Sequence, residues 1–258
     1  MFYRYIIILL LLTPLFIFTA KAQVNAYAAQ TGKLEFSTSS AEIIGEDAAK
    51  RFSKTLAKDD KIKWSIFVPD NYDPAKPPGI VVHMTQRNLA KTPIGWNTVL
   101  KEQNLIMVAL NKTGQLKLDK EMLIAVLSTS FIQDKYEINR ERVYIVASAD
   151  SCYPASVAME IYPGVFNGAV YSTCEPFNWR NNTPLTIEQM KDNSYLFVSS
   201  NEKNIRGAMR RSYQKYKEAG LTKVEYLRVQ KLFYGRQMDR RTYKKSISIL
   251  DKLDKRRK

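Results

Sequence analysis

The segment RVYIVASADSCY at residues 142–153 places a short apolar strand directly before a run of small residues. The sequence that follows is compatible with a helix up to residue 161, so the segment predicts a strand–turn–helix unit. Similar apolar runs recur along the chain and alternate with helical patterns; the predicted strands are residues 64–69 (ended by Pro69), 79–83, 105–110, 143–147, 168–172, 194–199 and 224–229. This alternation predicts an α/β fold, with a mainly parallel sheet flanked by helices on both faces.

Apolar residues at helical spacing predict further helices at residues 120–131, 205–219 and 241–253. Residues 23–58 are more polar, and we interpret them as an N-terminal extension with one strand at residues 33–36 and a short helix at residues 45–57. The rest of the sequence contains no repeat and no linker. We therefore expect residues 59–258 to form a single domain.

Charge and histidine content limit the chemistry. The 258 residues include 40 Lys and Arg against 25 Asp and Glu, a formal net charge of +15 that favours anionic partners. The single histidine, His83, excludes mechanisms that need two imidazoles, which include most zinc sites. The sequence has neither a glycine-rich phosphate loop nor a cluster of metal ligands, so we expect no cofactor and no metal.

The N-terminus has the layout of a secretory signal peptide. Arg4 precedes an apolar run at residues 5–18, and AKA at residues 20–22 forms a small-residue cleavage site before Gln23. The apolar run is shorter than the roughly 20 residues that span a bilayer, which argues against the alternative of an uncleaved anchor. We therefore expect residues 1–22 to be removed and the protein to be secreted or periplasmic, which disfavours nucleic acid as a partner.

Several segments resemble one family of esterases. Residues 142–153 resemble the strand and nucleophile elbow of α/β-hydrolases, and AMEIYPGVFNGAV at residues 158–170 resembles the next helix end and strand of polyhydroxybutyrate-depolymerase-type esterases. Upstream, FVPDNYDPAKPPGIVVH at residues 67–83 is similar to their oxyanion strand and the turn before it, and YKEAGL (216–221) and ISILDKL (247–253) fit their last helices. The resemblance implies an α/β-hydrolase-like fold over residues 64–253.

The same resemblance implies that the catalytic triad is degenerate. The elbow pattern G-x-S-x-G falls on ASADS at residues 147–151, so Ala149 occupies the apex, where the family has its nucleophile. The position of the family's histidine falls on Arg236, whose guanidinium stays protonated and cannot act as a general base. Glu202 is the only carboxylate in the segment where the catalytic acid is expected, and the oxyanion H-G pair reads His83-Met84.

These substitutions leave two hypotheses about activity open. The first is a non-catalytic protein that binds a small-molecule or polymer ligand in the old crevice, lined by His83, Met84, Ala149, Asp150 and Arg236. The second is a weak serine ester hydrolase with a displaced nucleophile, Ser148 or Ser151, acting with His83 and Glu202. Small residues near a tight turn are expected in either case, and Asp150 also suits the start of a helix.

Export and the positions of the two cysteines predict a disulfide between Cys152 and Cys174. The first lies three residues past the elbow apex and the second just past the next strand, so both are expected at the same edge of neighbouring strands. An exported protein would keep this bond oxidised.

A basic tail supports a third hypothesis, an envelope-associated interaction protein. Residues 231–258 contain 11 Lys and Arg and three Asp, a local net charge of +8. These charges are either the solvated face of the last helix or a contact with an anionic membrane surface or an acidic polysaccharide.

Overall fold

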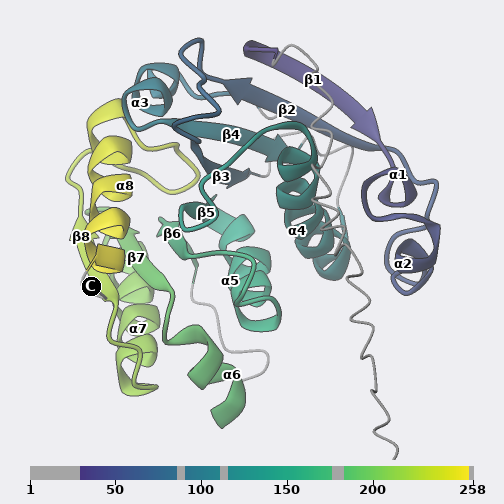
Figure 1. The fold of residues 1–258 in the computed structure, drawn as a ribbon. Helices are drawn as coiled ribbons and strands as arrows, with labels where there is room; N and C mark the ends of the chain where they lie inside the picture. Colours follow the sequence, from purple (N-terminus) through teal and green to yellow (C-terminus); the bar gives the residue numbers. More distant parts are fainter. Residues whose placement is uncertain (1–29, 86–90, 111–115, 176–182, 256–258) are drawn as a thin grey trace, which may run out of the picture.

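The computed structural model describes residues 30–85, 91–110, 116–175 and 183–255, and within them one sheet organises the chain (Figure 1). The sheet has eight strands in the order β1-β2-β4-β3-β5-β6-β7-β8. Pairs β1–β2 and β2–β4 are antiparallel, and all pairings from β4 to β8 are parallel. The strands are β1 (Gly32–Thr38), β2 (Ile62–Val68), β3 (Gly79–Met84), β4 (Leu105–Leu110), β5 (Val143–Ser148), β6 (Gly168–Ser172), β7 (Ser194–Ser199) and β8 (Val224–Arg228). The predicted mainly parallel sheet is confirmed.

Helices cover both faces of the sheet, as predicted. Helices α4 (Leu118–Lys135), α5 (Cys152–Ile161) and α7 (Lys203–Glu218) pack on one face, and α3 (Trp96–Glu102) and α8 (Arg240–Lys255) pack on the other.

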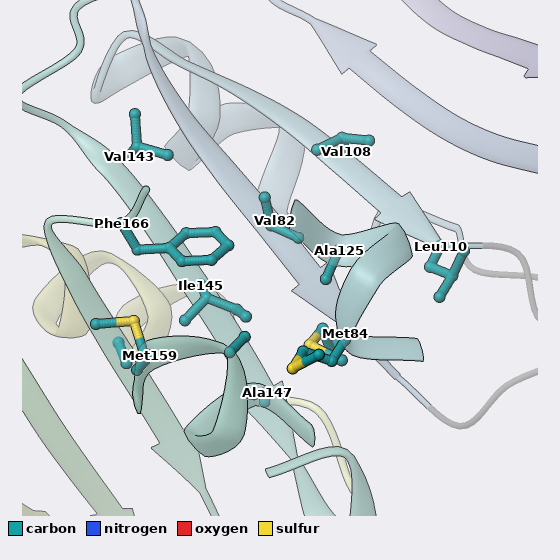
Figure 2. Packing of buried hydrophobic residues seen from close by; sticks show 14 of the residues in the cluster. Val82, Met84, Val108, Leu110, Ala125, Val143, Ile145, Ala147, Met159 and Phe166 are labelled. Carbon is teal, nitrogen blue, oxygen red and sulfur yellow. The ribbon is translucent and has the colours of Figure 1, made fainter. Parts of the chain in front are cut away.

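Strand residues alternate between two hydrophobic cores. Val82 belongs to the core under α4 and α5, whereas its neighbour Val81 belongs to the core under α3 and α8. Figure 2 shows the first core, to which Ile145 of β5 and Met159 of α5 both contribute. Because successive strand residues point to opposite faces, a strand buried on both faces reads as a continuous apolar run. This is the pattern from which β3, β4 and β5 were predicted.

The predicted N-terminal extension adds a strand to the sheet, because β1 pairs along its whole length with β2. The single helix predicted at residues 45–57 is wrong. Two short helices, α1 (Ser40–Ile44) and α2 (Glu46–Lys50), flank Gly45, and turns follow them. Ser39 caps α1 together with Glu42 in a capping box, and Gly45 ends it with φ +81°, a backbone conformation that glycine adopts without strain.

Besides α1, two helices were not predicted, α3 and α6 (Pro184–Met190). Each has seven residues, too few to display a helical period in the sequence. Helix α3 is held by its first residue, because the ring of Trp96 stacks on that of Tyr243 in α8 at 3.7 Å and its indole N–H donates to the carbonyl of Met238 at 2.8 Å.

The predicted signal peptide, residues 1–22, lies outside the described residues. Among the helices that the structure describes, none is both long and apolar enough to cross a bilayer.

Candidate functional site

The turn after β5 has the backbone of a nucleophile elbow. Ala149 has φ +52°, in the left-handed region that residues with a side chain rarely adopt. It starts a single 3-10 turn, η1 (Ala149–Ser151), and α5 begins directly afterwards at Cys152. The tight strand-to-helix turn is therefore kept, with a methyl group at the position that presents the attacking oxygen in an elbow.

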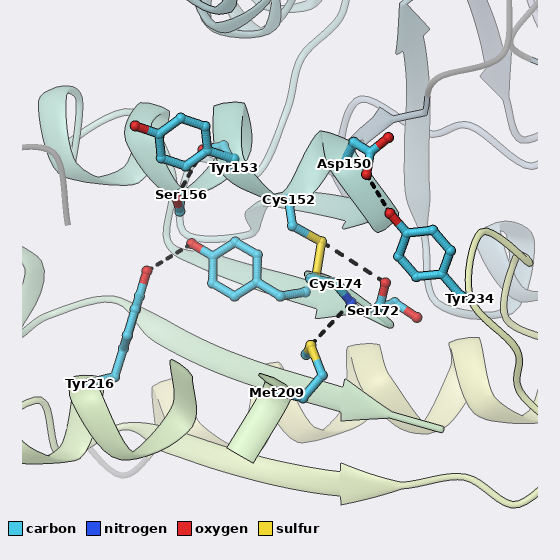
Figure 3. The surroundings of a disulfide bond; sticks show 10 residues. Asp150, Cys152, Tyr153, Ser156, Ser172, Cys174, Met209, Tyr216 and Tyr234 are labelled. Carbon is cyan, nitrogen blue, oxygen red and sulfur yellow. Dashed lines mark hydrogen bonds between the residues drawn. A yellow bond between two sulfur atoms is a disulfide. The ribbon is translucent and has the colours of Figure 1, made fainter. Parts of the chain in front are cut away.

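A disulfide joins this turn to the neighbouring strand. Cys152, the first residue of α5, is bonded to Cys174, which lies two residues after the end of β6, and their Cα atoms are 5.9 Å apart (Figure 3). Thr173, the residue between the end of β6 and Cys174, also has a positive φ, of +50°. The bond holds the start of α5 against the carboxyl end of β6, and the predicted pairing is confirmed.

Tyr234 connects three loops at the carboxyl edge of the sheet. Its hydroxyl donates to the carboxylate of Asp150 in the elbow (Figure 3), and its backbone N–H donates to Oε2 of Glu202 at 2.8 Å. Asp150 follows β5, Glu202 follows β7 and Tyr234 follows β8. The three loops that would carry nucleophile, acid and base in the resembled family therefore do converge.

The chemistry at this meeting point is that of a neutral phenol hydrogen-bonded to one carboxylate, that of Asp150, while Glu202 binds the backbone N–H of the same residue. Partial burial and the hydrogen bond to the Asp150 carboxylate raise the pKa of Tyr234, and the negative charge of Glu175 acts in the same direction. The Tyr234 hydroxyl therefore stays protonated at neutral pH and acts as a donor. Its role in this arrangement is to bind the loops together.

Arg236, which the resemblance aligns with the family's histidine, is exposed. It lines a cavity of about 520 Å³ together with Gln237, Asp239 and residues 91–94. The hydrogen bond from this loop to the elbow is made by Tyr234, two residues earlier. Among the described residues, the cationic Arg236 and Lys91 thus line this cavity with a single acidic residue, Asp239.

His83 lies behind that cavity rather than in it, with a relative exposure of only 1%. Its ring packs edge-on against Trp96 at 5.0 Å between centroids, and its Nε2 lies 3.4 Å from the amide nitrogen of Gln237. Met84, the next residue, is buried in the opposite core under α4 and α5. His83 and Met84, which the resemblance aligns with the oxyanion pair, therefore face opposite sides of β3.

The two candidate serines differ in exposure. Ser148, the last residue of β5, is half-buried. Ser151 has no exposed surface, and its Oγ has no hydrogen-bond partner among the described residues. A nucleophile must reach both a base and the substrate. The position of Ser151 gives it no path to a dissolved substrate.

Within the described ranges, no three His, Cys, Asp or Glu side chains are grouped closely enough to hold a metal ion. Sequence reasoning missed Tyr234, which the structure places at the centre of the site. An aromatic residue directly before Gly235 was the available signal, but its partners are distant in the chain.

Comparison with solved structures identifies the fold. A thermostable esterase superposes with a TM-score of 0.61 at 15% identity, covering 86% of this chain and 62% of that chain. Fungal esterases from Rhizomucor miehei superpose with a TM-score of 0.61 at 10% identity, covering 88% of this chain and 86% of theirs. A thermophilic carboxylesterase cloned from a metagenomic library gives a TM-score of 0.58 at 8% identity, covering 88% and 91%.

No protein-family model and no curated protein sequence matches the chain. The structural similarity nevertheless agrees with the observed sheet order and with the elbow after β5. The protein therefore has the α/β-hydrolase fold, with esterases among its structural neighbours.

Proposed function

We propose that the protein is an exported, non-catalytic member of the α/β-hydrolase superfamily, related to depolymerase-type esterases, that binds a ligand in the crevice its catalytic relatives use. The observation that carries the proposal is Ala149 at the elbow apex with φ +52°. The strained turn that presents a nucleophile is retained, while the side chain there has no oxygen to attack a carbonyl. Acyl transfer on this fold needs that oxygen and an imidazole to accept its proton.

The cavity beside Arg236 supports a binding role at one of the five predicted ligand-binding residues; the other four, His83, Met84, Ala149 and Asp150, do not line it. Its volume of about 520 Å³ is in the range of ligand sites. Arg236 and Lys91 outnumber Asp239, and a guanidinium pairs with a carboxylate through two parallel hydrogen bonds. We therefore assign this cavity to a small molecule or polymer end that carries a carboxylate.

Export is supported by two independent features. The N-terminal sequence has a charged start, a short apolar run and a small-residue exit before Gln23. The disulfide of Cys152 and Cys174 is of a kind that persists in oxidising compartments. Mass spectrometry of the protein isolated from cells that express the full chain should give an N-terminus at Gln23; an intact Met1 would contradict export by cleavage.

The test of catalysis compares five proteins: the wild type, Ala149→Ser, Arg236→His, the double variant of these two, and His83→Ala. We expect the wild type to hydrolyse p-nitrophenyl butyrate at background rate and to remain unlabelled by a serine-directed fluorophosphonate. Ala149→Ser alone should stay inactive, because Arg236 cannot accept the proton. Wild-type turnover that disappears in His83→Ala, with stoichiometric labelling, would refute the proposal and establish the displaced-serine mechanism.

The test of binding uses butyrate and 4-hydroxybenzoate as carboxylate probes, followed by protein NMR. Arg236→Gln should weaken binding about fivefold or more, since it removes a charge-assisted contact. The matched control is Arg51→Gln, which removes one exposed positive charge next to α2. Equal affinities for the two variants would remove Arg236 from the binding site.

A further inference from the structure

A second cavity, larger than the first, lies between α7 and β8 at the edge of the sheet. Its volume is about 1070 Å³. It is lined by residues of α7, among them Lys203, Arg206, Arg210 and Arg211, by Tyr226 and Arg228 of β8, and by Glu175. We call it the α7 groove.

The α7 groove is strongly positive. Five of its lining side chains are cationic and only Glu175 is acidic. On α7 the cations Lys203, Arg206 and Arg210 recur at spacings of three and four residues, which places them on one face of the helix. The opposite face is buried in the core through residues such as Ile205 and Met209.

These charges are not neutralised within the part of the chain that the structure describes. None of the five cations forms an ion pair there; Arg228 instead donates from Nε to Oδ1 of Asn201 at 2.8 Å. The basic helix α8 differs, because Arg240 and Lys244 both pair with Glu102, at 2.9 and 2.7 Å. Like charges three or four residues apart destabilise a helix, so the arrangement on α7 is unfavourable until an anion binds.

The floor and one wall of the groove suit a ring-shaped ligand. Gly207 carries no side chain in the middle of the cationic face, and a Cβ there would lie 3.4 Å from Nη1 of Arg211. Tyr213 and Tyr226 line the same groove, with ring centroids 5.6 Å apart. The Tyr226 ring is held in place by a hydrogen bond from its hydroxyl to Oγ of Ser199 at 2.7 Å.

We infer that the α7 groove binds an acidic oligosaccharide, with its sulfate or carboxylate groups on the arginines and a sugar ring against the tyrosines. The row from Lys203 to Arg210 extends over about 10 Å at 1.5 Å per residue, so it can contact several anionic groups of one chain. Guanidinium groups bind such anions through paired hydrogen bonds. The choice of a saccharide over a nucleic acid rests on the proposed export; the anion site itself does not.

The experiment measures the affinity of the full chain for a heparin-derived hexasaccharide, which carries sulfate and carboxylate groups. The test variant is Arg206→Gln, Arg210→Gln, Arg211→Gln. The matched control is Lys33→Gln, Lys54→Gln, Lys63→Gln, which removes three exposed charges near the opposite edge of the sheet. At about 0.1 M salt we expect at least about a tenfold loss for the α7 variant and less than about threefold for the control.

A third variant separates ring contact from charge. Tyr213→Leu keeps all five cations. We expect it to lower the affinity for the hexasaccharide about threefold and to leave the affinity for inorganic phosphate unchanged. The urea midpoints of all variants are measured alongside, and unchanged or higher values show that the binding losses are not due to unfolding.

Three results would overturn the inference. The wild type fails to bind the hexasaccharide, or the α7 variant and the control lose affinity equally, so that only the net charge matters. In the third, an oligothymidylate of matched charge binds more tightly than the hexasaccharide, and replacing the same three arginines abolishes its binding; this result would assign the groove to nucleic acid. None of these results depends on the labelling, turnover or N-terminal measurements that test the proposed function.

Discussion

Removing the disulfide between Cys152 and Cys174 should destabilise the whole domain, because the bond restricts the unfolded chain. The two cysteines are 22 residues apart in sequence. A loop of that length loses about 11 cal/mol/K of entropy in the unfolded state when it is closed, which is about 3.4 kcal/mol at 25 °C in the chain-entropy model. For a domain of this size, that corresponds to a fall in Tm of about 7–14 °C.

The assay compares urea unfolding of the oxidised wild type, the reduced wild type and the variant Cys152→Ala, Cys174→Ala. Reduction breaks the crosslink without removing any heavy atom. The difference in the free energy of unfolding between the oxidised and reduced proteins therefore measures how much the crosslink destabilises the unfolded chain. The variant also removes two sulfur atoms that are almost completely buried, and we expect it to be slightly less stable than the reduced protein.

Two results would refute this reasoning. In one, thiol titration of the denatured, unreduced protein finds two free thiols. In the other, the oxidised and reduced proteins have the same free energy of unfolding; the crosslink would then contribute nothing, and its role would be limited to the local geometry of the elbow.

Three other predictions concern the loops, the buried phenols and the tail. Tyr234→Phe should lower the free energy of unfolding by about 1 kcal/mol, because it removes the hydrogen bond to the exposed carboxylate of Asp150, whereas Tyr153→Phe, a matched control, should change it by less than about 0.5 kcal/mol; equal urea midpoints would contradict this. Burial raises the pKa of five tyrosines, Tyr144, Tyr171, Tyr195, Tyr216 and Tyr243. Above about pH 10 these phenols ionise in the unfolded chain but not in the folded one, so the free energy of unfolding should fall by up to about 1.4 kcal/mol per pH unit for each tyrosine. A flat profile of the free energy of unfolding between pH 9 and 11, measured by urea unfolding, would be incompatible with these raised pKa values. Replacing the four basic residues at positions 255–258 by glutamine should reduce co-sedimentation with phosphatidylglycerol vesicles at low salt, by up to about 1 kcal/mol per charge, and unchanged retention would eliminate the tail as a membrane contact.

The fold was largely predictable because its signals are local and repeated. Each parallel strand is buried on both faces and therefore reads as an apolar run, as in Leu105–Leu110. The errors lie where local signals are short. The helix predicted at residues 45–57 ends at Lys50, with a separate short helix before Gly45, and α3 and α6 are too short to show a period.

The candidate site was predictable only in part. Its loops follow predicted strands, so the structure brings Asp150 and Glu202 to one edge of the sheet, each bound to Tyr234. The partner that joins them was not predictable, since Tyr234 lies 84 residues from Asp150 and 32 from Glu202. Only the path of the loop after β8 decides that Tyr234, and not Arg236, makes the hydrogen bond to the elbow.

What the sequence determined by itself is the class of fold, the alanine at the elbow and the pair of cysteines, because each depends on residue type within a short segment. What only the tertiary structure decided is which distant side chains meet. The arginines of α7 line a groove because β8 places Tyr226 and Arg228 beside them. His83 is buried because Trp96 and Gln237 pack over it. Residue types and spacing are encoded locally, whereas the positions of loops and of neighbouring elements follow from packing the whole chain around one sheet.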